Sequence, residues 1–129
     1  LFLAPSTPAQ YAALALFRPD CIAELEARRA QFAQRLQYLL PALEGLGFVV
    51  PAKPQGAFYI YADISGLQHE LANDSMAFCL ELLEQTGVAI TPGIDFGHQH
   101  GHHFVRFAYT ADIPVLAEAV NRIETFLKS

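Results

Sequence analysis

The amino-acid sequence predicts an α+β fold: a small, mostly antiparallel sheet with helices packed on one side, preceded by a long linker helix. Apolar residues recur three and four positions apart in segments 20–45 and 112–127, which is typical of amphipathic helices. Short runs rich in β-branched and aromatic residues, bounded by Gly and Pro, separate the helical segments and favour strands. The resulting order of elements suits a two-layer α+β domain.

The first predicted element is a helix from about Thr7 to Phe17. Thr7 is a suitable N-cap, Pro8 suits the first helical position, and Gln10 completes a capping box. Few of its positions are polar, so we expect the helix to be buried on nearly all sides. The chain begins with Leu1 rather than Met, and we expect it to be a fragment of a longer protein.

A second, longer helix is predicted from Asp20, as its cap, to Gly45. Its apolar stripe consists of Ile22, Leu25, Phe32, Leu36, Leu39 and Leu43. Pro41 lies in the last turn and should bend or shorten that end of the helix.

Strands are predicted at 48–50, 57–62, 88–91 and 103–109. Between the second and third of them, Asn73 or Asp74 caps a helix that runs to about Thr86, and Gly87 stops it. The last helix starts at Asp112, and its apolar stripe consists of Leu116, Ala119, Val120, Ile123 and Leu127.

Composition limits the classes of function. The net charge of -5 argues against nucleic-acid binding, which requires clustered Lys and Arg. No apolar run is long enough to span a bilayer, so we expect no membrane partner. Charged residues make up only 16% of the chain and apolar residues 53%. This large apolar share indicates that some faces pack on another domain or subunit. Cys21 and Cys79 have no metal or redox spacing and are predicted to be free thiols in a reducing cytoplasm.

Arg106 lies inside an otherwise apolar, aromatic run, residues 103–109. A guanidinium stays charged at physiological pH and needs an anionic partner in an apolar layer. The partner is either a carboxylate of this chain, with Asp63, Asp95 and Asp112 as candidates, or a carboxylate brought by a ligand.

The order of motifs around Arg106 resembles the C-terminal, small domain of class I/II pyridoxal-phosphate-dependent aminotransferases, which have the aspartate aminotransferase fold (fold type I). The shared features are a short strand, Pro92-Gly93, Phe96-Gly97, a further Gly and an arginine flanked by aromatic residues. The run Lys-Pro-Gln-Gly-Ala-Phe-Tyr at 53–59 is similar to a family motif at the start of a central strand. We expect its two aromatic residues, Phe58 and Tyr59, to be mainly core, with a substrate contact from this strand as the alternative.

The resemblance implies roles for several residues. Arg106 would grip the α-carboxylate of the substrate in a bidentate pair. Phe96 and Gly97 would lie on a loop near the active-site entrance, although an inert surface loop has the same composition. Ser6 and Thr7 are predicted to cap a helix, and in some family members polar residues at this place reach the phosphate of the partner subunit's cofactor.

The resemblance also implies an organisation. Residues 1–19 would end the large domain, 20–45 would form the connecting helix, and 46–129 would form the small C-terminal domain. The complete enzyme would be a cytoplasmic homodimer that moves an amino group between an amino acid and a 2-oxo acid. Its pyridoxal 5'-phosphate would be bound by the missing large domain. Neither Lys53 nor Lys128 has the setting of the Schiff-base lysine, so we expect the fragment alone to be inactive.

Other interpretations remain open. The cluster His98, His100, His102 and His103 resembles metal-binding tracts, but a solvated loop without metal is the favoured interpretation. The alternatives for function are a non-catalytic α+β domain that binds small carboxylated metabolites through Arg106 and a related pyridoxal-phosphate lyase or synthase. A structural domain that neutralises Arg106 internally is a further alternative.

Overall fold

The computed structural model describes residues 4–97 and 99–129, and its contacts divide the chain into two units, residues 1–33 and 34–129. The first unit contains helix α1 (Thr7–Leu14), a short 3-10 helix at Ala15–Phe17 and the start of helix α2 (Pro19–Gly45). The second unit contains the rest of α2, three strands and helices α3 (Ser75–Thr86) and α4 (Ile113–Leu127).

Helix α1 differs from its prediction in two ways. It begins at Thr7, so Ser6 rather than Thr7 occupies the N-cap position, and Ser6 makes no side-chain cap bond. The side-chain amide of Gln10 donates to the Pro5 carbonyl instead of closing a capping box. The predicted burial is also wrong: α1 has no buried residue, and Tyr11 is 73% exposed, because none of the described residues of the first unit covers this apolar helix.

Helix α2 also departs from its predicted start and end. It begins at Pro19, and Asp20 lies in its first turn, where its carboxylate pairs with Arg18 at 2.8 Å rather than capping the helix. Pro41 does not shorten the helix, which continues to Gly45. Burial of Leu39 and Leu43 beside the proline offsets the hydrogen bond that it removes.

The sheet has the order β1-β3-β2, with both pairs antiparallel, and is formed by β1 (Tyr59–Asp63), β2 (Thr91–Pro92) and β3 (Phe104–Ala108). The predicted strand at 48–50 is reduced to one bridge, because Val49 exchanges two backbone hydrogen bonds with Asp63 and Pro51 then ends the pairing. The predicted strand at 88–91 begins only at Thr91, because the Val88 N–H is bound to the Thr86 side chain.

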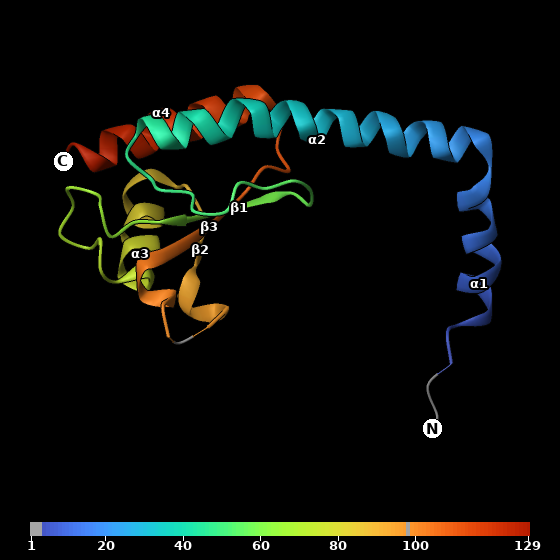
Figure 1. The fold of residues 1–129 in the computed structure, drawn as a ribbon, viewed down its shortest axis with the longest axis horizontal. Coiled ribbons are helices and arrows are strands. Elements are labelled where there is room, and N and C mark those ends of the chain that lie inside the picture. Colours follow the sequence, from blue (N-terminus) through green and yellow to red (C-terminus); the bar gives the residue numbers. More distant parts are fainter. Residues whose placement is uncertain (1–3, 98) are drawn as a thin grey trace. The chain divides into compact units, whose positions relative to one another are not determined.

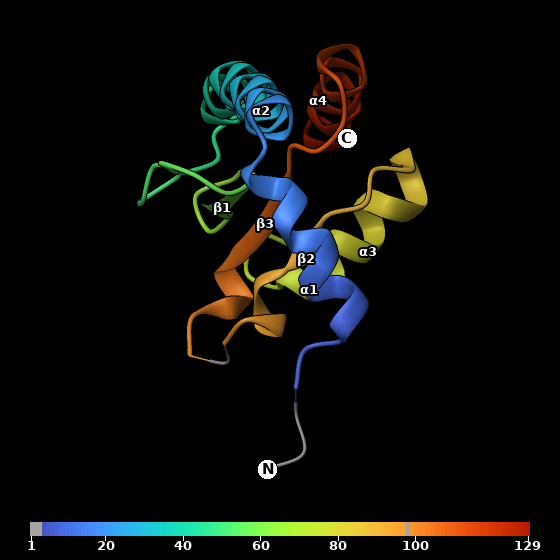
Figure 2. The ribbon, with the colours of Figure 1, turned by 90° about the vertical axis from the view of Figure 1, so that its right-hand side faces the viewer.

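The core of the second unit lies between one face of the sheet and the helices. Four alternating strand residues turn toward this core and are at most 4% exposed: Ile60, Ala62, Val105 and Phe107. Figures 1 and 2 show α4 beside the C-terminal half of α2 and α3 on the same side of the sheet as α4. The ring of Phe48 meets Phe78 and Phe107 edge to face, with centroids 6.4 and 5.2 Å apart. The predicted α+β fold is therefore confirmed.

Helix α3 begins and ends as its sequence predicts. The Asp74 carboxylate accepts hydrogen bonds from the backbone N–H groups of Met76 and Ala77, and Gly87 takes a left-handed conformation at φ 72°. Helix α4 begins at Ile113, so Asp112, the predicted first residue, occupies the N-cap position. Its carboxylate makes no cap bond and pairs with Arg35 at 2.5 Å.

Two further predictions can be compared with the described residues. Both cysteines are free, Cys21 half-buried and Cys79 buried. Within the described part of the chain, none of the helices combines the length and the apolarity that crossing a bilayer requires.

Candidate functional site

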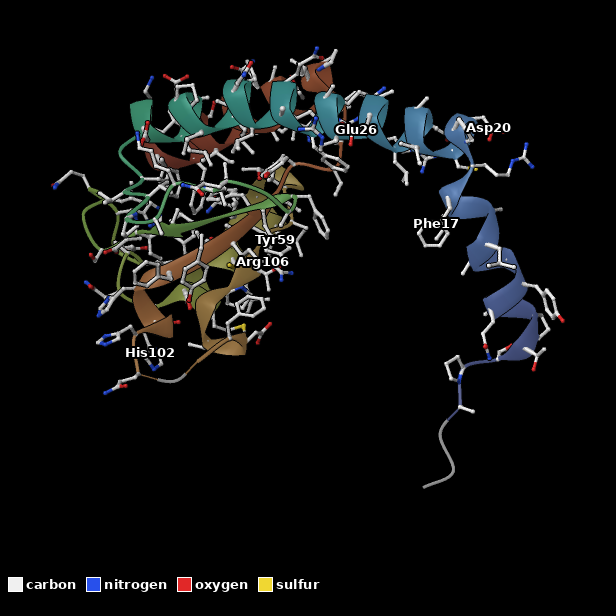
Figure 3. The ribbon with its side chains drawn as sticks, turned by 45° about the vertical axis from the view of Figure 1, so that its right-hand side comes forward. Phe17, Asp20, Glu26, Tyr59, His102 and Arg106 are labelled. Carbon is white, nitrogen blue, oxygen red and sulfur yellow. The ribbon has the colours of Figure 1, made fainter. Side chains whose placement is uncertain are left out.

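The face of the sheet opposite the core carries polar and aromatic side chains around Arg106. In the antiparallel register Arg106 lies opposite Tyr61 of β1 on one side and opposite Thr91 of β2 on the other. Because strand side chains alternate, these three residues share one face, together with Tyr59 and Phe104. Figure 3 shows Tyr59 and Arg106 next to one another on this face.

The Arg106 guanidinium is half-buried and has few polar partners. Its Nη2 donates to the Thr91 hydroxyl at 3.4 Å, which is long for a hydrogen bond. Its Nε is buried and has no hydrogen-bond partner among the described residues. Two rings lie within cation–π distance of the guanidinium carbon, Phe96 at 4.4 Å and Tyr59 at 5.2 Å.

Among the described residues, no carboxylate forms an ion pair with Arg106, although three were candidates. Asp112 pairs with Arg35 instead. The Asp63 side chain accepts the backbone N–H of Ser65 at 2.8 Å. Asp95 lies close enough to Cys79 for its charge to raise the pKa of that thiol. The guanidinium therefore faces the open side of the sheet without an internal anion.

The loop that carries Phe96 is closed at its base by two glycines that touch. A Cβ on Gly93 would lie 2.5 Å from the Phe104 carbonyl oxygen, 2.6 Å from the Gly101 carbonyl oxygen and 2.7 Å from the Tyr61 hydroxyl. A Cβ on Gly101 would lie 2.7 Å from the Gly93 backbone. Only glycine fits at both positions. This contact holds the short 3-10 helices Gly93–Asp95 and Gly101–His103 together and fixes where the loop leaves the sheet.

Burial raises the pKa of two ionisable groups in this region. The Tyr61 ring stacks on Phe104 with centroids 4.8 Å apart, and burial raises the pKa of the Tyr61 phenol. Beneath the sheet, on α3, burial and then the charge of Asp95 raise the pKa of Cys79 to about 12. Neither the Tyr61 phenol nor the Cys79 thiol therefore adds a negative charge near Arg106 at neutral pH.

The described lysines do not contribute to this face. The Lys53 ammonium pairs with Glu44 at 3.3 Å and Lys128 pairs with Glu124 at 2.5 Å, and both side chains are exposed. A Schiff-base lysine reacts through a free amine that points at the cofactor, whereas each of these exposed ammonium groups is paired with a carboxylate. These residues do not fit a covalent anchor for pyridoxal phosphate.

The other predicted site residues fall into separate groups. Phe96 contacts Arg106, whereas Gly97 has open space where a side chain would start. Ser6 and Thr7 belong to the first unit, where they form the start of α1. No group of three or more His, Cys, Asp or Glu side chains in residues 4–97 and 99–129 is arranged to hold a metal ion, and His98 lies outside the described residues.

Sequence reasoning missed the contact of Tyr59 with Arg106 and the hydroxyl of Thr91. Tyr59 was expected to be core, but it is 40% exposed and Phe58 is 44% exposed, because the core side of β1 is filled by Ile60 and Ala62. Alternation along β1 puts Tyr59 and Tyr61 on one face of the strand. The register that brings this face beside Arg106 and Thr91 is set by strand pairing, which alternation alone does not predict.

A family model described as aminotransferase class I and II matches residues 1–123, nearly the whole chain. The chain belongs to the class I and II aminotransferase family. It is 39% identical over 127 residues to a valine–pyruvate aminotransferase of Mycobacterium tuberculosis, covering 98% of this chain and 32% of that protein. It is 36% identical to an asparagine–oxo-acid transaminase of Streptococcus mutans, covering 95% of this chain and 30% of that protein.

Solved aminotransferase structures have the same fold. A crystal structure of an aminotransferase from Mycobacterium tuberculosis superposes with a TM-score of 0.88 at 38% identity, covering 99% of this chain and 32% of that one. The chain thus spans about a third of the length of the aminotransferases that it matches.

Proposed function

We propose that this chain forms the C-terminal part of a pyridoxal-phosphate-dependent aminotransferase in which Arg106 binds the α-carboxylate of the amino acid and of the 2-oxo acid. The observation that carries the proposal is a guanidinium on the open face of the sheet without a carboxylate partner among the described residues. A planar guanidinium forms two parallel hydrogen bonds to a carboxylate, which fix its orientation as well as its affinity.

The remaining parts of the catalytic site belong outside this chain in our proposal. The family uses pyridoxal phosphate, which when bound acts as an electron sink for the substrate Cα. Because Lys53 and Lys128 do not fit as its anchor, the lysine and the phosphate-binding groups would come from the other two thirds of the enzyme, and a homodimer would complete the site. Arg106 contributes orientation: it holds the substrate so that the bond at Cα meets the catalytic base.

The relatives named above are transaminases, which favours amino-group transfer over a lyase or synthase reaction. A binding domain without catalysis would use the same guanidinium, and the transaminase names of these relatives favour the enzyme over such a domain.

The test is Arg106→Ala in the full-length enzyme. Loss of two charge-assisted hydrogen bonds should lower kcat/KM for the amino acid about 10²- to 10³-fold. The absorbance of the bound cofactor should stay unchanged, because Arg106 does not hold it. Unchanged kinetics would remove the assignment.

A further inference from the structure

The environment of Arg106 combines a partly desolvated cation with aromatic rings rather than with acids. The ring centroids of Phe96 and Tyr59 lie 4.4 and 5.2 Å from the guanidinium carbon, both inside the range of about 6 Å in which a ring face attracts a cation. The electron-rich ring faces compensate part of the cost of burying the charge.

A ring and a carboxylate stabilise a guanidinium in different ways. The five N–H donors of an arginine lie in the plane of its head group, so an acid binds at the edge of this plane and occupies donors. A ring that contacts the cation through its face accepts no N–H in that plane. An aspartate at position 96 would neutralise Arg106, whereas Phe96 leaves its donors available.

The accessible edge of the guanidinium is defined by the same contacts. Nε is buried without a partner among the described residues, so a ligand reaches it only if the side chain moves. Nη2 makes a weak contact with Thr91 at 3.4 Å. A carboxylate therefore binds to the terminal edge of the guanidinium, through its two Nη atoms.

The two rings are themselves held in place. The Phe96 backbone N–H donates to the Gly93 carbonyl at 2.9 Å, directly at the closed base of the loop, and the Tyr61 ring meets Phe96 edge to face at 6.2 Å. Tyr59 belongs to β1 and packs against Phe58 with centroids 4.8 Å apart.

We propose that Phe96 and Tyr59 are positioning residues: their rings hold the guanidinium of Arg106 so that its two Nη atoms point toward an incoming carboxylate. The inference rests on the proposed function. It adds an explanation of how the Arg106 guanidinium is oriented while its N–H donors stay available to a substrate. Phe96 is the stronger of the two because it lies closer to the cation.

The test replaces Phe96 in the full-length enzyme by phenylalanines with one, two and three ring fluorines. Fluorine withdraws electrons from the ring face while nearly preserving its shape, so only the attraction to the cation weakens. The KM for the amino acid should rise step by step, by about twofold to thirtyfold in total, with little change in kcat. The same series at Phe126, a ring of α4 that is 2% exposed in the core and away from the Arg106 face, should leave KM unchanged.

Two further variants separate the outcomes. Phe96→Leu removes the ring and should raise KM at least as much as three fluorines do, and Tyr59→Leu should raise it less. If Arg106→Ala lowers kcat/KM but KM does not follow fluorine number at position 96, the rings only fill space and this inference is wrong. If Arg106→Ala itself has no effect, the proposed function fails first.

Discussion

Two arginines of the same domain, Arg35 and Arg106, differ in what surrounds the guanidinium. Arg35 of α2 donates to the Thr110 carbonyl at 2.8 Å and to the Asp112 carboxylate at 2.5 Å, and its side chain is only 14% exposed. It joins α2 to the turn between β3 and α4. Among the described residues, Arg106 contacts one hydroxyl weakly, that of Thr91, and two ring faces, those of Phe96 and Tyr59.

In our proposal this difference separates a structural role for Arg35 from a carboxylate-binding role for Arg106. A guanidinium whose donors are used by the chain's own carbonyl and carboxylate contributes to stability and offers little to a ligand. A guanidinium that is held by ring faces keeps its donors and its charge. From the sequence alone the two arginines could not be separated in this way, because Asp112 was a candidate partner for Arg106 and is in fact the partner of Arg35.

The largest loss of folding stability should come from Gly93→Ala, at the base of the loop beside Arg106. Its Cβ would lie 2.5 to 2.7 Å from two backbone oxygens and the Tyr61 hydroxyl, so the loop base must open, at a cost of about 3 kcal/mol. Denaturant unfolding of the variant measures this loss. Gly97→Ala is the matched control on the same loop, because a Cβ there meets nothing within 4 Å and should change stability by less than about 0.5 kcal/mol. Equal losses for both variants would show that the glycine contact is not what closes the loop.

A smaller loss of folding stability is expected from Arg35→Met, which removes the contacts around the second arginine of the comparison. The variant keeps the apolar stem and loses the bonds to Thr110 and Asp112, which should lower the free energy of unfolding by about 1 to 2 kcal/mol. Arg28→Met, which removes an exposed pair with Glu24 on the same helix, should cost at most about 0.5 kcal/mol. In the full-length enzyme, kcat/KM of Arg35→Met should stay near the wild-type value. A large loss of amino-acid binding would contradict its structural role.

A last effect, confined to alkaline pH, concerns Cys79, whose thiol pKa is raised by burial and then by the charge of Asp95. Its pKa is raised from 9.0 to about 12, so the folded state keeps a proton that the unfolded chain loses. Stability should therefore fall as pH rises from about 9 to about 12. Burial raises the pKa of Tyr61 and Tyr109 as well, which adds to the same trend. The measurement is the free energy of unfolding of wild type and of Cys79→Ala across this pH range. The difference between their slopes against pH is the contribution of the thiol, and equal slopes would refute it.

Local signals predicted several parts of the fold and site well. Asp74 and Gly87 bound α3 because capping and left-handed φ are properties of single residues. The position of Arg106 in a strand followed from the aromatic residues around it. The order of Pro92-Gly93, Phe96-Gly97 and Arg106 identified the family that the comparisons then showed.

The predictions that were wrong concern features set by contacts rather than by single residues. Whether Val49 and Val88 join the sheet depends on partners that are far away in the sequence or on a neighbouring side chain, such as Asp63 for Val49. The exposure of Tyr59 and its contact with Arg106 depend on register between β1 and β3, which alternation alone does not fix. The burial expected for α1 would have required a neighbouring surface that the first unit does not contain.

The central claim is that Arg106 recognises a carboxylate. The most direct measurement compares kcat/KM for an amino acid and for the amine that lacks its α-carboxylate, in the full-length wild type and in Arg106→Ala. We predict that the wild type prefers the amino acid by about 100-fold or more. In Arg106→Ala, kcat/KM for the amino acid should fall while kcat/KM for the amine stays nearly unchanged, so most of this preference is lost. The same preference in both proteins would contradict the account.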